Sequence, residues 1–214
     1  MDHAKILRIM EEEGKKRGAP VYKKDRIIKT PFQALIFTLL SARARDAGTI
    51  KVCDELFSKA DSPAKIAEMD EEELRKILRS IGFYREKAKR VLAASRRILG
   101  EFGGKVPGTR EKLMELPGVG RKTANIILNR EFGKPALAVD VHVHRIANRL
   151  GWMKTKKAPD TEKRLVELLP EKLVRRCNRA MVGYGQTICI PRNPKCRECR
   201  VIKYCKRVGL PELD

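Results

Sequence analysis

Four cysteines near the end of the chain are the residues whose types and spacing most clearly indicate chemistry. Cys189, Cys196, Cys199 and Cys205 follow the pattern C-x6-C-x2-C-x5-C. Four thiolates can surround one inorganic centre, and an all-sulfur ligand set suits an iron–sulfur cluster or zinc. Structural zinc sites usually divide their ligands between two C-x2-C-like pairs that are far apart in the sequence. Because only one such pair is present, the spacing favours a [4Fe–4S] cluster over zinc, and over four unrelated or disulfide-bonded cysteines.

A glycine-containing segment, LPGVGRKTA at residues 116–124, has the features of a phosphate-binding turn. Pro117 ends a first helix, and Gly118 and Gly120 allow a tight turn without side-chain bulk before a second helix. Backbone N–H groups at the start of that second helix can face a phosphate, aided by the helix dipole. A lone G-x-G is often only a loop, but the longer string opening a helix is more specific. The predicted DNA contacts of this segment are Pro117, Gly118, Val119, Gly120 and Arg121.

The composition indicates a polyanionic partner. The chain carries 48 Lys+Arg against 27 Asp+Glu, which gives a net charge of +21 and a pI of about 10.0. Such an excess favours nucleic acid as the partner, although a solvated basic surface is the simpler alternative. Glutamine is rare while Lys, Arg and Glu abound, a bias that resembles hyperthermophile proteins.

The sequence contains no candidate membrane segment. No apolar run approaches the roughly eighteen residues needed to span a bilayer, and the N-terminus has no apolar signal segment. We therefore expect a cytoplasmic, nucleoid-associated protein that does not contact a membrane. A reducing compartment also agrees with cluster cysteines rather than disulfides. The other two cysteines, Cys53 and Cys177, are interpreted as buried small hydrophobic residues.

The elements that must position these residues are predicted to be almost entirely helical. Thr30-Pro31-Phe32-Gln33 supplies an N-cap, a proline at the first helical position and a capping-box glutamine. By the same logic, helices begin at Ser62 and Asp70, and Thr109 caps a short helix. Further helices are predicted over 84–99, 121–131, 141–150, 160–169 and 171–185.

One short stretch, residues 139–144, allows two interpretations. Its alternation of apolar and polar residues is typical of a strand. As a strand it would place Asp140, His142 and His144 on one face, which resembles a metal site. A lone strand has no partner, however, so we predict a helix with Asp140 as its N-cap.

Together, these motifs resemble one known family. The matching elements are LPGVGRKTAN at 116–125, AVDVHVHR at 138–145 and the cysteine spacing at 189–205, with a weaker match in LLSARARD at 39–46. In this order, and over essentially the whole chain, they resemble the endonuclease III family of DNA glycosylases in the helix-hairpin-helix superfamily.

The resemblance implies an all-α fold of two helical domains. One would be a six-helix barrel domain at 25–134 that contains the helix-hairpin-helix. The other would be an iron–sulfur cluster domain made of 1–24 plus 135–214, with the lesion pocket between the two. The expected partner is double-stranded DNA containing a damaged base or an abasic site, bound by a monomer.

The resemblance assigns the chemistry to Lys122 and Asp140. A glycosylase that also cuts the backbone needs an amine that attacks C1′ of the sugar and forms a Schiff base. Lys122 would stand in the first turn of its helix, where the dipole disfavours the charged amine. Asp140 would stabilise the positive charge that develops on the sugar and assist proton transfer. The simpler alternatives are a phosphate-binding lysine and a plain helix N-cap; His142 is interpreted as structural, and His144 has no predicted role.

Further DNA contacts are predicted at three cations. Arg43 stands where bacterial members have Gln, which fills the gap left by the flipped base. Arginine can fill that gap and hydrogen-bond the orphaned base, but its reach and charge differ, so the opposite-base preference is not predicted. A phosphate contact is the alternative for Arg43. In the cysteine segment, Arg197 and Lys203 would face phosphates if a cluster held the loop rigid.

The sequence therefore predicts a bifunctional DNA glycosylase and apurinic/apyrimidinic lyase that excises oxidised pyrimidines in base excision repair. A mismatch-specific glycosylase is the nearest alternative, but such relatives typically carry Ser or Tyr at the position of Lys122. A non-catalytic, metal-stabilised DNA-binding module would need neither Lys122 nor Asp140. An electron-transfer ferredoxin would need neither the hairpin nor the basic charge.

Overall fold

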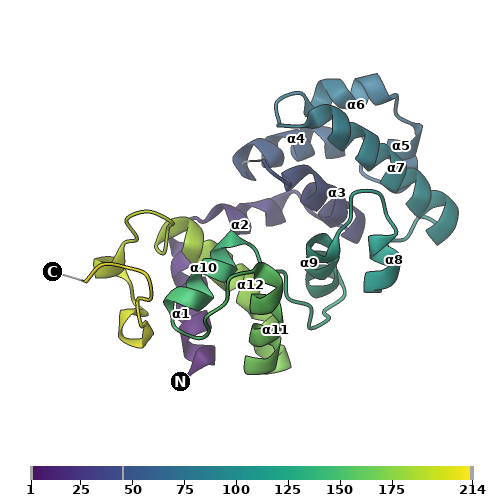
Figure 1. The fold of residues 1–214 in the computed structure, drawn as a ribbon. Helices are drawn as coiled ribbons and strands as arrows, with labels where there is room; N and C mark the ends of the chain where they lie inside the picture. The colour runs from purple at the N-terminus through teal and green to yellow at the C-terminus, as the bar shows by residue number, and fades with distance from the viewer. Residues whose placement is uncertain (1, 45, 213–214) are drawn as a thin grey trace. The chain divides into compact units, whose positions relative to one another are not determined.

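The structure is a computed structural model that describes residues 2–44 and 46–212, and this part of the chain is helical without a β-strand (Figure 1). The all-α prediction is therefore confirmed. The chain divides into two compact units. The terminal unit consists of Met1–Lys23 and Lys134–Asp214, and the central unit consists of Lys24–Gly133. No helix in the described residues is both long and apolar enough to cross a membrane.

The terminal unit is built around a pair of packed helices, α1 (His3–Lys16) and α12 (Glu171–Thr187). Where they cross, a Cβ added to Gly14 would lie 3.1 Å from the backbone carbon of Gly183, so glycine at this position favours the close approach of the two helices. Fully buried apolar side chains from both helices form the core, each contributing about 1.5–3 kcal/mol. The remaining elements are α2 (Pro20–Lys23), α10 (Val141–Arg149), α11 (Ala158–Leu168) and the 3₁₀ helices η2 (Cys196–Glu198) and η3 (Ile202–Tyr204).

A buried carboxylate connects α1 to the cysteine segment. Glu13 is 5% exposed and accepts hydrogen bonds from Arg17 at 3.3 Å and from Arg200 at 3.1 Å. Arg17 also pairs with Glu198 at 2.9 Å. Because a buried charge is tolerated only when it is paired, these contacts fix the segment around Cys199 against α1.

The central unit is organised around α3 (Pro31–Ser41), whose residues Leu35, Ile36 and Leu40 are fully buried. It packs against α9, α4 and α7. The other elements of this unit are η1 (Lys24–Arg26), α4 (Asp46–Lys59), α5 (Pro63–Glu68), α6 (Glu71–Leu78), α7 (Tyr84–Phe102), α8 (Arg110–Met114) and α9 (Arg121–Glu131).

The predicted helix starts are confirmed by side-chain caps. Thr30 accepts a hydrogen bond from the Gln33 amide, and Ser62, Asp70 and Thr109 cap their helices in the same way. The Gln33 side chain returns to the backbone, but to the N–H of Lys29 rather than to that of the capping residue. The prediction of a helix over residues 141–150 is also confirmed, since α10 spans Val141–Arg149.

Candidate functional site

The predicted phosphate-binding turn lies between α8 and α9 of the central unit. Gly118 has φ +83°, a conformation that strains other residues, and a Cβ there would lie 3.0 Å from Cδ of Arg90, so this position favours glycine. The amide of Val119 donates to the carbonyl of Leu116 at 3.0 Å and closes the turn. Gly120 is the N-cap of α9, and a Cβ at this position would contact nothing within 4 Å. The protein therefore leaves open space at the start of α9, where the positive end of the helix dipole favours an anion.

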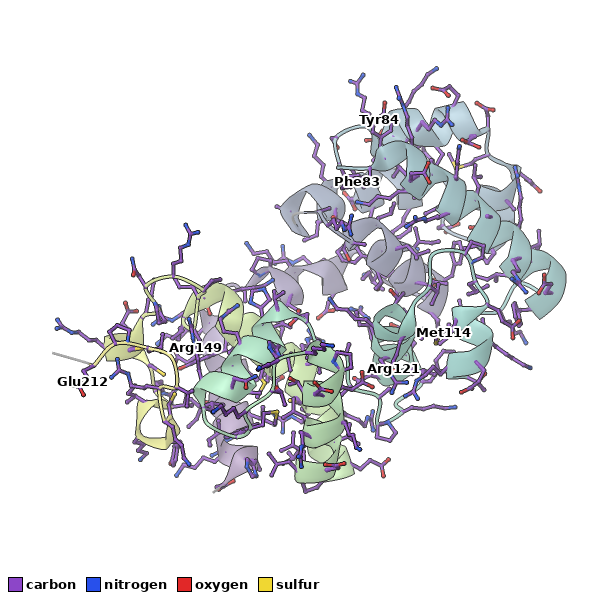
Figure 2. All side chains as sticks on the ribbon, viewed as in Figure 1. Phe83, Tyr84, Met114, Arg121, Arg149 and Glu212 are labelled. Atoms are coloured by element: carbon purple, nitrogen blue, oxygen red, sulfur yellow. The ribbon has the colours of Figure 1, made fainter. Side chains whose placement is uncertain are left out.

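Lys122 is the second residue of α9 and its side chain is exposed. It directly follows the turn, so an anion bound at the start of α9 would lie close to its amine. Arg121, which precedes it, is also exposed at the N-terminus of α9 (Figure 2). The helix N-terminus expected at Lys122 is present, whereas the side chain is not buried within the central unit.

Asp140 is the N-cap of α10 in the terminal unit. Its Oδ1 accepts hydrogen bonds from the amides of His142 and Val143, both at 2.9 Å. The segment before it is fixed by the side-chain amide of Asn178, which donates to the carbonyl of Ala138 at 2.6 Å. These contacts orient the carboxylate, and in the described part of the chain its Oδ2 accepts no hydrogen bond. The capping role and a catalytic role of Asp140 are therefore compatible.

The two histidines after Asp140 have structural contacts. Nδ1 of His142 lies 3.1 Å from Arg145, and Nδ1 of His144 lies 2.7 Å from the buried hydroxyl of Thr161. A strand would have aligned His142 and His144 with Asp140 on one face, but the helix α10 does not, so the metal site of the strand interpretation does not form in the described residues.

Arg43 lies beside an exposed aromatic residue that the sequence analysis did not single out. Phe83 is 62% exposed, has φ +58° and stands immediately before α7 (Figure 2). The guanidinium of Arg43, a residue that also has a positive φ of +54°, lies 5.8 Å from the centre of the Phe83 ring. The two side chains line one cavity together with Leu39, Ala42, Glu86, Lys87, Arg90, Gly118 and Thr123. An exposed phenylalanine next to a cation is suited to contact with bases.

The same cavity is lined by a second residue that the sequence analysis did not identify, Lys87. Lys87 is only 6% exposed, and its Nζ has no hydrogen-bond partner among the described residues. Burial lowers the pKa of Lys87, while the nearby Cys53 thiol opposes this shift. The periodicity of α7 contains a signal for it, because Lys87 lies one turn before Val91 on the buried face of the helix, whereas Lys89 lies on the exposed face.

The four predicted ligand cysteines line one cavity of the terminal unit, which we call the cysteine cavity. Its walls are mostly apolar, and the lining residues besides the cysteines are Met10, Ile146, Arg149, Leu150, Tyr184, Ile188, Pro194, Lys195, Val201, Ile202 and Leu210. Burial raises the pKa of Cys199 and of Cys205. No three Cys, His, Asp or Glu side chains of the described residues are arranged to hold a single metal ion.

Hydrogen-bond donors surround the sulfurs. The Tyr184 hydroxyl donates to Sγ of Cys199 at 3.2 Å, and Nη1 of Arg149 lies 3.5 Å from Sγ of Cys189. Figure 2 shows Arg149 beside the cysteine segment, where it also donates to the carbonyls of Ile190 and Pro191. Arg197 and Lys203 are exposed on this segment. The four thiols and these donors form a set that fits an inorganic cluster with negatively charged ligands.

The comparisons agree with a DNA-repair fold. Residues 36–171 match the model of the HhH-GPD superfamily of base excision DNA repair proteins. An endonuclease III from Thermotoga maritima is 48% identical over 82% of this chain and 83% of its own length. The chain therefore belongs to the HhH-GPD superfamily and, within it, to the endonuclease III family.

Solved structures show the same relationship. The structure of a trapped endonuclease III–DNA covalent intermediate with an estranged adenine matches with a TM-score of 0.83 at 33% identity, covering 95% of this chain and 94% of that one. A thermostable thymine-DNA glycosylase matches with a TM-score of 0.82 at 25% identity, covering 96% of this chain and 95% of that one. The fold is thus shared by enzymes of both kinds.

Proposed function

We propose that this base excision repair glycosylase and lyase excises oxidised pyrimidines by Schiff-base chemistry, with Lys122 as the nucleophile. The observation that supports this most is the position of Lys122, an exposed amine in the first turn of α9 directly after the predicted phosphate-binding turn. The turn would hold the backbone of the damaged strand through its phosphate, which carries no sequence information. Recognition of the lesion must then come from other residues.

In the proposed reaction the neutral amine of Lys122 attacks C1′ of the damaged nucleotide. The base leaves with the electrons of the glycosidic bond and is protonated. The attached amine loses a proton, and the C1′–O4′ bond then breaks while O4′ takes up a proton, which leaves a ring-opened C1′ iminium. The iminium makes the C2′ proton acidic, and loss of that proton expels the 3′ phosphate and cuts the strand. Asp140 would stabilise the positive charge on the sugar while the base leaves and would assist proton transfer.

The two proposed catalytic residues belong to different units of the chain, with Lys122 in the central unit and Asp140 in the terminal unit. Their joint action on one nucleotide is part of the proposal, as are the domain limits 25–134 and 1–24 plus 135–214.

Arg43 and Phe83 are proposed to occupy the space that a flipped nucleotide leaves in the duplex. Flipping costs a few kcal/mol because stacking and pairing are lost. An exposed ring that enters the stack, next to a guanidinium that can hydrogen-bond the orphaned base, would repay part of this cost. The 5.8 Å approach of the two side chains supports a common role.

The cysteine cavity is proposed to hold a [4Fe–4S] cluster ligated by Cys189, Cys196, Cys199 and Cys205. The all-thiol donor set within one largely apolar cavity supports this assignment. When bound, the cluster would supply a one-electron centre and would hold the segment that carries Arg197 and Lys203 in place. These two cations would then face DNA phosphates in a fixed arrangement.

Trapping by borohydride tests the proposed function. If Lys122 forms a Schiff base, reduction during turnover on a duplex with an oxidised pyrimidine will link protein and DNA covalently. Lys122→Gln should abolish both trapping and strand cleavage while binding to DNA persists, because the change removes one cation from a surface with many. Lys112→Gln, an exposed lysine of α8, is the matched control and should be trapped like the unmodified protein. Full cleavage by Lys122→Gln would contradict the assignment, because another amine would then have to form the Schiff base. Base release without trapping or strand cleavage by the unmodified protein would instead favour a mismatch glycosylase.

A further inference from the structure

Tyr184 brings a hydroxyl group into the cysteine cavity. The residue lies on α12 and is only 1% exposed. Its hydroxyl donates a hydrogen bond to Sγ of Cys199 at 3.2 Å. A phenol hydroxyl enclosed among apolar side chains such as Ile188 and Val201 is costly unless it finds a partner. The sulfur of Cys199 supplies that partner.

The chemistry of the two groups sets the direction of this hydrogen bond. A phenol has a hydrogen that it can donate, whereas a thiolate that ligates a metal has none and can only accept. The Tyr184 hydroxyl is therefore the donor and Sγ of Cys199 the acceptor.

The backbone of Tyr184 contacts a second cysteine. Its carbonyl accepts a hydrogen bond from the amide of Cys189 at 3.0 Å. Tyr184 thus contacts two of the four cysteines, one through its side chain and one through its main chain, and α12 holds it rigidly between them.

We propose that the Tyr184 hydroxyl sets the reduction potential of the inorganic cluster in the cysteine cavity. The proposal rests on the [4Fe–4S] assignment made above. The reduced cluster carries one more negative charge than the oxidised cluster, and a donor to a ligand sulfur stabilises that added charge. The apolar wall strengthens this effect, because little water competes for the sulfur. The hydroxyl therefore makes the cluster easier to reduce by an external one-electron donor.

The other donors to the sulfurs are weaker candidates for this role. Nη1 of Arg149 lies 3.5 Å from Sγ of Cys189, and the amide of Arg207 lies 3.4 Å from Sγ of Cys205. Both distances are longer than that of Tyr184. Arg149 also holds two backbone carbonyls of the segment, so its substitution would change the loop together with the electrostatics.

Tyr184→Phe removes the hydroxyl and keeps the ring, so the packing of α12 is preserved. We expect the equilibrium between reduced and oxidised cluster to shift three- to tenfold toward the oxidised form. For a one-electron couple, this shift makes the reduction potential about 28–59 mV more negative. The potential is measured at an electrode on the full chain, after iron content and visible absorption have been determined for each protein.

Tyr204→Phe is the matched control. Tyr204 stands next to Cys205, but among the described residues its hydroxyl forms no hydrogen bond with a cysteine sulfur, so the potential should stay that of the unmodified protein.

The possible outcomes separate the two proposals. An unmodified protein that is colourless and free of iron would remove the cluster assignment itself. An iron-loaded Tyr184→Phe protein with an unchanged potential would overturn the inference alone. The same holds if Tyr204→Phe shifts the potential equally, or if Tyr184→Phe fails to bind a cluster that the control binds, because the hydroxyl would then be needed for assembly.

Discussion

The two glycines of the turn before α9 should respond differently to alanine. Gly118 has φ +83°, and a Cβ would lie 3.0 Å from Cδ of Arg90 and 3.4 Å from Cδ2 of Leu39. An L-residue in the left-handed region costs about 1–2 kcal/mol. The contact with Arg90 adds little, because the long side chain can move. In a chain of this size about 1 kcal/mol lowers Tm by about 2–4 °C, so Gly118→Ala should lower Tm by roughly 2–8 °C.

Gly120 has an extended backbone, with φ −95° and ψ 178°, that any residue can adopt. Alanine there loses about 0.5 kcal/mol as an N-cap but gains about 0.4–1 kcal/mol from a less flexible unfolded chain. The two effects nearly cancel, so Tm should change by no more than about 2 °C. The added methyl group nevertheless occupies the open space at the start of α9 that a phosphate must approach. We expect affinity for DNA to fall about tenfold, or about 1.4 kcal/mol.

The assay combines thermal unfolding, followed by circular dichroism, with fluorescence anisotropy on a duplex that carries an uncleavable abasic analogue. Gly100→Ala in α7 is the control, since its Cβ also contacts nothing within 4 Å and the position lies in another helix. It should stabilise the protein by about 0.5–1 kcal/mol and leave DNA binding unchanged. The reasoning is refuted if Gly118→Ala melts at the unmodified temperature, or if Gly120→Ala binds DNA as tightly as Gly100→Ala.

Three further predictions concern charge. Burial alone would raise the pKa of Glu13, but hydrogen bonds from Arg200 and Arg17 outweigh it and hold this pKa below its usual value of 4.5. The stabilisation of the folded state by ionised Glu13 is therefore complete above the unfolded-state pKa and is lost as pH falls through the folded-state pKa. Glu13→Gln should lower the free energy of unfolding by about 1–2 kcal/mol near neutral pH and make stability depend less on pH in the acid range. Reversing the charges of Arg197 and Lys203 together should weaken binding to all DNA sequences alike. The slope of log affinity against log salt concentration should fall by the amount expected for about two lost phosphate contacts, which anisotropy at several salt concentrations will test. Asp140→Asn should slow base release about a hundredfold or more yet still cut a preformed abasic site. Its Tm should be nearly unchanged, because Asn is also a good N-cap. Single-turnover kinetics on both substrates test this, and equal slowing of base release and of abasic-site cleavage would contradict it.

The helix starts could be predicted because each depends on local chemistry. Thr30, Ser62, Asp70 and Thr109 satisfy amides only two or three residues away, so neighbouring sequence is sufficient. The sequence analysis did not predict α4 (Asp46–Lys59), which begins without a comparable cap-and-proline pattern. The sequence feature that best indicates α4 is the spacing of its buried residues Val52, Cys53 and Leu56, which matches a helical period.

The surroundings of the site were harder to predict than its motifs. Phe83 was missed because an aromatic residue is expected in the core, and its positive φ and 62% exposure are set by the junction between α6 and α7. The same limit applies to the hydrogen bond from Tyr184 to Cys199, since it joins residues of different elements. Sequence spacing identifies candidate ligands, whereas the groups that adjust their chemistry come from tertiary packing.

The choice between a lyase and a mismatch glycosylase depends on side chains and not on the fold. A thymine-DNA glycosylase and an endonuclease III–DNA intermediate match this chain almost equally well, with TM-scores of 0.82 and 0.83. A phosphate contact at the turn of Gly118 and Gly120 would be the same whatever base is attached, so the turn cannot separate the two activities either. An amine at position 122 can form a Schiff base, whereas the hydroxyl of Ser or Tyr cannot. Under the proposed mechanism, the difference between the activities is concentrated in one side chain on a shared scaffold, and the identity of residue 122 carries more weight than overall structural similarity.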